Sequence, residues 1–191
     1  MLSNIFVSDV RVRLLHELTK NTDGELHVRE LTRRVDTEVN AIRRELTNLE
    51  GIDLVFRRPH GNRIYYKINR YHTLYPEILG LIGKEFGLGR KIIDTHENLG
   101  KISYAVLRRN FIDGTKGDGK EIDLMLVGNI NLKKAEELIA EEEIKTKQQI
   151  HFTVLDNEEL KYRKQRKDPF LMNILLTPKV MLIGVEEDLV N

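Results

Sequence analysis

The chain has 191 residues, of which 40% are hydrophobic and 32% charged, and its formal net charge is +1 at pH 7. This composition provides enough apolar side chains for a packed core and differs from that of disordered chains. The absence of cysteine excludes disulfide frameworks, thiolate metal sites and cysteine nucleophiles. No apolar run approaches the roughly 20 residues that span a bilayer, and the N-terminus lacks the pattern of a signal peptide. We therefore expect a soluble cytoplasmic protein without a membrane partner.

The first third of the sequence predicts three helices followed by a β-hairpin. Ser8 is typical of a helix N-cap, and Gly51 is typical of a helix end. Residues 59–62, Pro-His-Gly-Asn, favour a hairpin loop. The elements expected here are a helix at 9–20, a short extended piece at 26–28, helices at 29–34 and 38–50, and strands at 54–58 and 63–68. This order predicts a winged helix-turn-helix domain over residues 1–75.

The rest of the sequence changes character after one more helix, expected at 71–86. We expect a linker helix at 76–90 and a second domain at 91–191, in which strands and helices alternate as in an α/β domain. The overall fold class predicted is therefore α+β. The elements expected in the second domain are a helix at 91–99, a strand at 103–107, a flexible loop at 114–120, a strand at 122–127, a helix at 131–143, a strand at 150–155, helices at 158–167 and from 168 onward, and a strand at 180–183.

Seven arginines lie in the segment 33–63, and their placement indicates DNA binding. The second helix of a helix-turn-helix enters the major groove, which here is the helix 37–49. Its apolar stripe faces the core, so the polar residues between face outward. Asn40 can read adenine and Arg44 can read guanine, while Thr37 at the helix start can donate to phosphate. The expected DNA contacts are Thr37, Asn40, Arg43, Arg44 and Thr47 on this helix, and Arg57, Arg58, His60, Asn62 and Arg63 on the wing.

Other interpretations of these residues remain open. Arg43 and Arg44 would instead form salt bridges within the helix, with Glu38, Glu45 or Glu50. The hairpin would be a solvated loop, and the winged helix would bind a protein in place of DNA.

Five segments of the sequence resemble those of a known family. They are NAIRRELTNLE at 40–50, GNRIYYKIN at 61–69, EIDLMLVG at 121–128, KDPFL at 167–171 and PKVMLIG at 178–184. The chain resembles ArsR-type winged-helix regulators, in particular a prokaryotic group fused to a minimal nucleotidyltransferase domain. This resemblance implies a second domain with a mixed sheet and an active site of Gly-Ser, a pair of acids and a third acid.

The nucleotidyltransferase motif is incomplete in this sequence. Glu121 and Asp123 match the paired acids that share magnesium. Arg109 and Asn110 stand where Gly-Ser is expected, and the strand at 150–155 holds no third acid. We therefore expect no cofactor and a domain that has lost catalysis. In the alternative, Glu121 and Asp123 bind magnesium, and the protein is an active nucleotidyltransferase that modifies a protein or RNA with Mg-NTP.

Together these features predict a sequence-specific DNA-binding transcriptional regulator. Its expected partner is double-stranded DNA. We expect a homodimer, because one recognition helix buries little surface and two-fold pairing adds affinity. The C-terminal domain would serve dimerisation or bind a nucleotide or protein partner.

Overall fold

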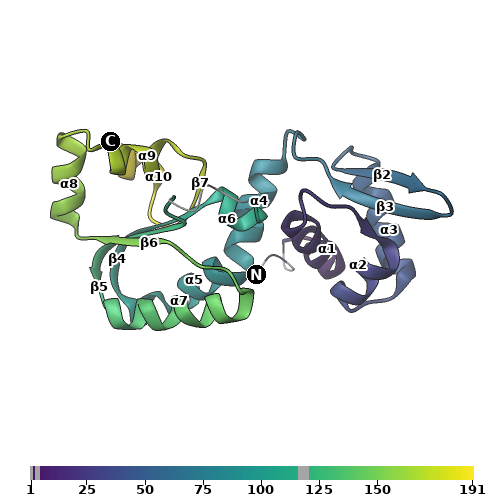
Figure 1. The fold of residues 1–191 in the computed structure, drawn as a ribbon, viewed down its shortest axis with the longest axis horizontal. Coiled ribbons are helices and arrows are strands. Elements are labelled where there is room, and N and C mark those ends of the chain that lie inside the picture. The colour runs from purple at the N-terminus through teal and green to yellow at the C-terminus, as the bar shows by residue number, and fades with distance from the viewer. Residues whose placement is uncertain (1, 3–4, 116–120) are drawn as a thin grey trace. The chain divides into compact units, whose positions relative to one another are not determined.

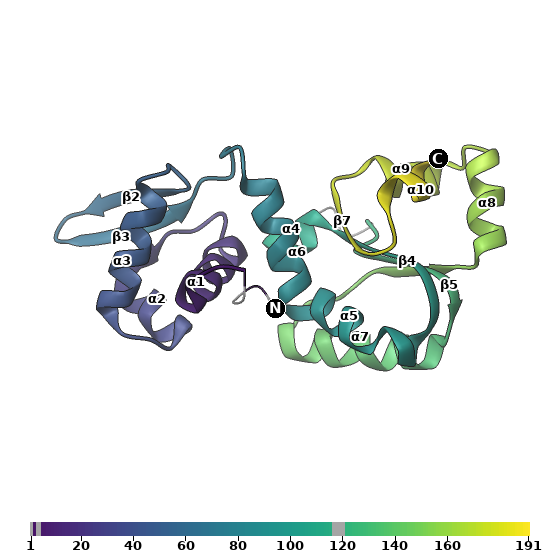
Figure 2. The ribbon, with the colours of Figure 1, turned by 180° about the vertical axis from the view of Figure 1, so that it is seen from behind.

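The computed structural model describes residues 2, 5–115 and 121–191 (Figures 1 and 2). It contains helices and two sheets, which confirms the α+β class. The chain divides into two compact units: unit 1 comprises Met1–Glu85 and Ile112–Thr115, and unit 2 comprises Phe86–Phe111 and Lys116–Asn191. Most of the loop expected at 114–120 lies outside the described residues, as does part of the N-terminus.

No helix in the described part of the chain has both the length and the apolar content needed to cross a membrane.

Unit 1 contains the elements expected for the first domain, together with the helix that follows them. They are α1 (Asp9–Lys20), β1 (Leu26–His27), α2 (Val28–Val35), α3 (Val39–Glu50), β2 (Val55–His60), β3 (Arg63–Ile68) and α4 (Tyr75–Glu85). The strands form an antiparallel sheet in the order β1-β3-β2. Its core is aliphatic, and the most buried side chains include Leu14, Leu18, Leu31, Ile42, Leu46, Leu54, Ile68 and Leu79.

The local signals that begin and end these elements are mostly those expected. Ser8 is the N-cap of α1, and its side chain accepts a hydrogen bond from the backbone N–H of Arg11. The hairpin turn is tighter than expected, because Pro59 pairs with Ile64 in the ladder and the strands continue to His60. Proline is tolerated there because β2 is an edge strand. Gly61 has φ +60°, which suits a two-residue hairpin turn.

Unit 2 is built on a four-stranded mixed sheet. The strand order is β6-β5-β4-β7, with β5 and β6 parallel and the other pairs antiparallel. Its elements are α5 (Gly87–Leu99), β4 (Gly100–Arg108), β5 (Leu124–Ile130), α7 (Leu132–Thr146), β6 (Phe152–Leu155), α8 (Asn157–Gln165), α9 (Pro169–Leu176), β7 (Lys179–Ile183) and α10 (Glu186–Val190). The short helix α6 (Arg109–Asp113) begins in unit 2 and ends in unit 1.

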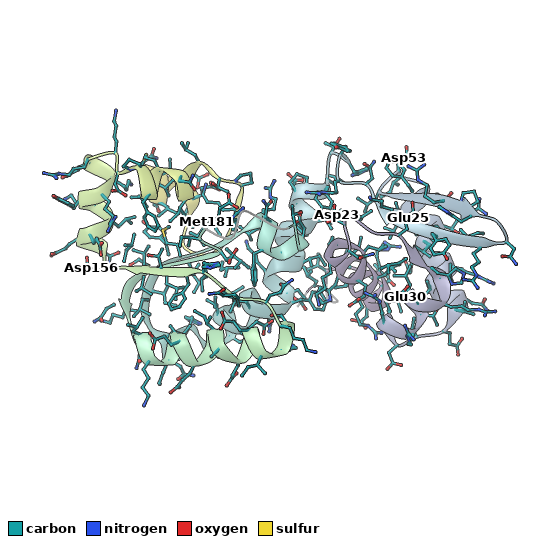
Figure 3. The ribbon with its side chains drawn as sticks, in the orientation of Figure 1. Asp23, Glu25, Glu30, Asp53, Asp156 and Met181 are labelled. Carbon is teal, nitrogen blue, oxygen red and sulfur yellow. The ribbon has the colours of Figure 1, made fainter. Side chains whose placement is uncertain are left out.

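Helices cover both faces of this sheet. In both views α5 and α7 lie on one side, and α8, α9 and α10 lie on the other (Figures 1 and 2). The second side packs an aliphatic cluster that includes Val106, Met125 and Leu171, against which Met181 packs (Figure 3). Side chains that alternate along β4 and β5 therefore meet different helical layers, which explains why the second half of β4 and the first five residues of β5 are buried.

Two details of unit 2 correct the expectations from the sequence. The strand expected at 122–127 begins only at Leu124, so Glu121 and Asp123 precede it. Helix α8 begins at Asn157, one residue before the start expected at 158, and its N-cap is Asp156, whose side chain accepts from the N–H of Glu159 at 2.7 Å (Figure 3). The helix α10 was not predicted.

Candidate nucleic-acid interface

Helix α3 is divided into a buried face and an exposed polar face. Ile42, Leu46 and Leu49 are buried in the core of unit 1. The polar residues expected on the opposite face, Asn40, Arg43, Arg44 and Thr47, are all exposed. The structure therefore brings these four side chains together on one solvent-facing surface.

The two arginines of α3 form almost none of the salt bridges considered from the sequence. The described residues give Arg43 no ion pair, and Arg44 lies 4.0 Å from Glu45 while its side chain stays 70% exposed. Thr47 donates its hydroxyl hydrogen to the carbonyl of Arg43 at 3.0 Å, so its side chain lies along the helix. Both guanidinium groups can thus reach a partner in solvent.

The start of α3 differs by one residue from the expected cap. Helix α3 has Glu38 as its N-cap, without a side-chain hydrogen bond, and Asp36 in the left-handed conformation precedes it. Thr37 lies between them and is half-buried, and its backbone N–H donates to Thr32. Only the hydroxyl group of Thr37 is then available for a phosphate.

The β2–β3 hairpin carries the second group of expected contacts, and all five are exposed. These are Arg57, Arg58, His60, Asn62 and Arg63. The guanidinium of Arg58 lies 5.4 Å from the centre of the Phe56 ring, and the His60 ring lies edge-on to Tyr65. His60 also lies 3.0 Å from Glu25, which Figure 3 labels. The hairpin therefore presents three arginines, and its histidine already has an acidic neighbour.

A buried glutamate on α3 was missed as a positioning residue. Glu45, with a side chain only 3% exposed, accepts hydrogen bonds from Ser8 Oγ and Arg11 Nε, both at 2.8 Å. These contacts join α3 to the start of α1. The sequence suggested Glu45 as a partner of Arg43 or Arg44, but its main partners lie 34 and 37 positions away.

The pKa of Glu45 reflects two opposing effects. Burial alone would raise it, because the charged form is poorly solvated. The hydrogen bonds from Ser8 and Arg11 and the positive charge of Arg11 outweigh burial, and the pKa lies below its ordinary value of 4.5. Glu45 is therefore ionised at neutral pH and stabilises the packing of α1 on α3.

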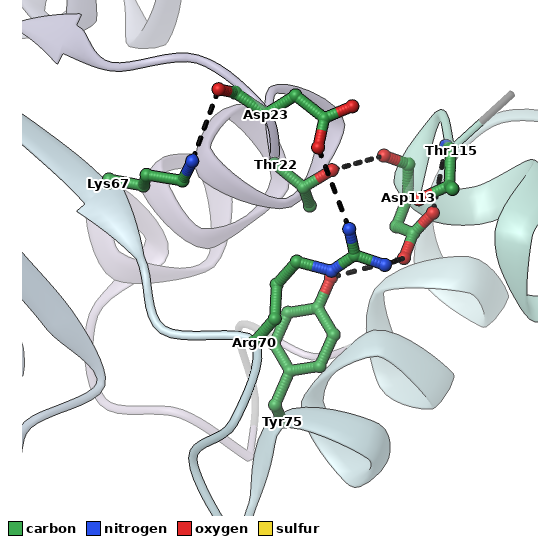
Figure 4. A network of polar contacts seen from close by, with 7 residues as sticks. All are labelled: Thr22, Asp23, Lys67, Arg70, Tyr75, Asp113 and Thr115. Atoms are coloured by element: carbon green, nitrogen blue, oxygen red, sulfur yellow. Dashed lines mark hydrogen bonds and ion pairs between the residues drawn. The ribbon is translucent and has the colours of Figure 1, made fainter.

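A second polar network holds the chain where it leaves the wing (Figure 4). Asp113, 2% exposed, accepts from Arg70 and Tyr75, each at 3.4 Å, and from the N–H of Thr115 at 2.9 Å. The hydroxyl of Thr22 donates to the Asp113 carbonyl at 3.2 Å. Residues 112–115 thus belong structurally to unit 1, although about 40 positions separate them from the wing.

In unit 2 the paired acids already have protein partners. Glu121 forms an ion pair with Arg108, and Asp123 accepts from the backbone N–H of His151 at 3.0 Å. Within the described ranges, no group of three or more His, Cys, Asp or Glu residues could hold a metal ion. Both carboxylates are therefore engaged by other protein groups in this structure.

The position expected to hold Gly-Ser is occupied by the start of a helix. Arg109 begins α6, and its backbone N–H donates to the carbonyl of Pro178 at 3.0 Å. That N–H is therefore not available to a phosphate.

Unit 1 has the architecture of a winged helix-turn-helix domain, with α2 and α3 as the paired helices and β2–β3 as the wing. No protein-family model matches the chain, and a search of curated proteins finds no significant match. Similar solved structures include two bacterial proteins. Reduced HlyU from Vibrio cholerae N16961 is 24% identical, with a TM-score of 0.36 over 44% of this chain and 84% of HlyU.

The second is MepR, a transcription regulator of the Staphylococcus aureus multidrug efflux pump MepA. It is 14% identical, with a TM-score of 0.40 over 51% of this chain and 73% of MepR. Human N-acetylserotonin methyltransferase in complex with SAM is 15% identical, with a TM-score of 0.32 over 61% of this chain and 36% of the enzyme. All three scores are low, so the interface described above stands on the geometry of this chain alone.

The lowered pKa of Glu45 predicts a pH-dependent contribution to stability. A group with a depressed pKa stabilises the fold above its ordinary value, and this stabilisation is lost as the pH falls through the lower, folded value. We expect Glu45→Gln to reduce the free energy of unfolding by roughly 1–3 kcal/mol at neutral pH, with the difference from wild type shrinking below the ordinary value of 4.5. Urea denaturation at neutral and acidic pH measures both.

The matched control is Glu38→Gln, which changes an exposed glutamate at the start of the same helix. It should leave the stability nearly unchanged at either pH. A Glu45→Gln effect that is independent of pH would contradict the assigned ion pair.

Proposed function

We propose that the protein is a sequence-specific DNA-binding transcriptional regulator whose helix α3 enters the major groove. The observation that carries this proposal is the exposed polar face of α3, with two arginines free to reach a partner, opposite a fully buried apolar face. Arginine binds guanine bidentately and asparagine binds adenine, so Arg44 and Asn40 are the proposed base readers. Arg43 and Thr47 complete the proposed contacts along this helix, and Thr37 offers its hydroxyl to phosphate.

The wing supplies contacts to the DNA backbone in this proposal. Its arginines, Arg57, Arg58 and Arg63, are exposed on a two-stranded hairpin whose tip is a two-residue turn. Contacts to phosphates fix orientation without reading sequence directly. His60 and Asn62 are the remaining proposed wing contacts. A wing with these charges favours nucleic acid over a protein partner.

We propose further that the protein is of the ArsR-like type and acts as a homodimer. A single recognition helix gives a small interface, whereas two copies related by two-fold symmetry read a palindromic site. The proposed domains are the winged helix at 1–75, a linker helix at 76–90 and a nucleotidyltransferase-like domain at 91–191. In the structure, the proposed linker covers most of α4 and the start of α5.

We propose that the nucleotidyltransferase-like domain has lost catalysis. The support is local: Arg108 neutralises Glu121, His151 engages Asp123, and the N–H of Arg109 is already bonded. A domain of this kind would contribute dimerisation or the binding of a nucleotide or protein partner.

Removing the proposed guanine reader should weaken binding and broaden specificity. After selection of a binding site from random duplex DNA, we expect Arg44→Ala to cost roughly 1–3 kcal/mol on that site, with less loss on a site changed at one base pair. Fluorescence anisotropy on both duplexes measures this. Equal affinity for wild type and Arg44→Ala on the selected site would refute the docking of α3.

Removing a wing arginine should weaken binding to all DNA sequences by a similar factor. Arg58→Ala removes one phosphate contact, so the slope of log K against log salt should become shallower by about 1. The control is Lys133→Ala, which removes the same charge from an exposed position on α7. An unchanged salt slope for Arg58→Ala, or the same change for Lys133→Ala, would argue against a wing contact.

A catalytic assay tests the proposed loss of activity. Incubation with labelled ATP, CTP or GTP, magnesium or manganese, and lysate as acceptor should give no transfer of label above background. Transfer by the wild-type protein that disappears in Asp123→Ala would establish the protein as a nucleotidyltransferase instead. The DNA-binding measurements are independent of this result.

A further inference from the structure

Basic residues are concentrated around the turn between α8 and α9 in unit 2. Five of the seven residues at 161–167 are Lys or Arg and none is acidic, although acids outnumber bases over residues 76–191. Helix α8 ends at Gln165, and Lys167, with φ +50°, lies where the chain turns into α9 (Figure 1). We call these basic residues the α8–α9 cluster: Lys161, Arg163, Lys164, Arg166 and Lys167.

One cation of the α8–α9 cluster has a structural role, whereas the other four lack an acidic partner. Arg163 donates to Glu159 at 2.7 and 2.9 Å and to Asp168 at 3.3 Å, so it joins α8 to the start of α9. Among the residues that the structure describes, the other four form no ion pair; three of them are exposed and Lys164 is half-buried. Neighbouring cations without counter-ions in the protein favour a partner that carries several negative charges.

Two exposed aromatic residues lie beside these cations. The guanidinium of Arg166 lies 4.8 Å from the centre of the Tyr162 ring, and Tyr162 is 54% exposed. The guanidinium of Arg163 lies 5.7 Å from the centre of the Phe170 ring, and Phe170 is 40% exposed. Neither aromatic residue belongs to the aliphatic cluster that packs this face of the sheet. Both rings are therefore held at the surface next to positive charge, where a flat ligand can stack on them.

We propose that the α8–α9 cluster binds single-stranded nucleic acid, with phosphates on its lysines and unpaired bases stacked on Tyr162 and Phe170. Surfaces that bind single strands combine positive charge along the backbone with aromatic side chains on which bases stack, and arginine adds to the stacking. A duplex offers the same phosphates, but its bases are stacked inside the double helix and cannot reach the two rings. Single-stranded DNA and RNA share the chemistry required, and the proposal does not depend on duplex binding by unit 1.

An anionic membrane is the other partner that a basic surface can attract. A helix that lies in a membrane interface buries a wide apolar face in the lipid. The exposed residues of α8 are polar apart from Tyr162, so this helix offers no such face. The combination of charge with two separate rings therefore favours nucleic acid.

Fluorescence anisotropy of the full chain with labelled oligo(dT) and oligo(U) of about 12 nucleotides tests this surface. Tyr162→Ala should weaken binding roughly tenfold because one base loses its stacking partner, whereas Tyr162→Phe keeps the ring and should keep the affinity. The double variant Lys161→Gln/Lys164→Gln removes two charges, so the slope of log K against log salt should become shallower by about 1.4. The matched control, Lys133→Gln/Lys134→Gln, removes two charges from exposed positions on α7 and should leave the slope unchanged.

The comparison ligands are the duplex selected for binding by unit 1 and vesicles of phosphatidylcholine and phosphatidylserine in equal parts. Variants of the α8–α9 cluster should leave the affinity for the duplex unchanged, so a failure of this proposal leaves the proposed role of α3 untouched. Tighter binding of oligo(U) would identify RNA as the preferred ligand, and tighter binding of oligo(dT) would identify DNA.

Several results would overturn the proposal. Wild type could bind neither oligonucleotide, or bind the vesicles alone, which would assign the cluster to a membrane. Tyr162→Ala could bind as tightly as wild type, or the α7 control could lose as much affinity as Lys161→Gln/Lys164→Gln. An equal loss on the duplex and on the single strands would show that the cluster does not select unpaired bases.

Discussion

The buried carboxylate of Glu45 determines how the proposed DNA-reading surface is held. It lies on the helix that carries Arg43 and Arg44, yet it faces inward, where Ser8 and Arg11 bond to both of its oxygens. A charge at 3% exposure is stable only with such partners, so the start of α1 and the middle of α3 must remain in contact. The neighbouring arginines are left without a strong acidic partner. One ion pair thus stabilises the helix packing and keeps the outer face of α3 open to other ligands.

Much of unit 1 could be predicted from the sequence because its signals are local. The helical spacing of Ile42, Leu46 and Leu49 indicates which face of α3 is buried, and this simultaneously identifies the exposed residues. The wing was predictable from β-branched and aromatic residues around a Gly-Asn turn. What could not be predicted depends on distant partners: Glu45 with Arg11, and Asp113 with Arg70, are contacts that neither periodicity nor spacing reveals.

Unit 2 shows the same division between local and distant information. The alternation of strands and helices was sufficient to predict a mixed α/β domain. The positions of Glu121 and Asp123 were harder to predict. Their spacing suggested two carboxylates that project together from a strand, whereas the strand begins only after Asp123. Their partners, Arg108 and His151, come from the ends of neighbouring segments.

The return of residues 112–115 to unit 1 has a consequence for how the protein can be divided. A fragment ending at residue 85 would contain every helix and strand of the winged helix but would lack Asp113, the buried acceptor for Arg70 and Tyr75. The Arg70 guanidinium and the Tyr75 hydroxyl would each lose a buried acceptor where the chain leaves the wing. The residues of unit 1 are therefore not continuous in the sequence. Residues 112–115 complete its packing, although the chain on either side of them belongs to unit 2.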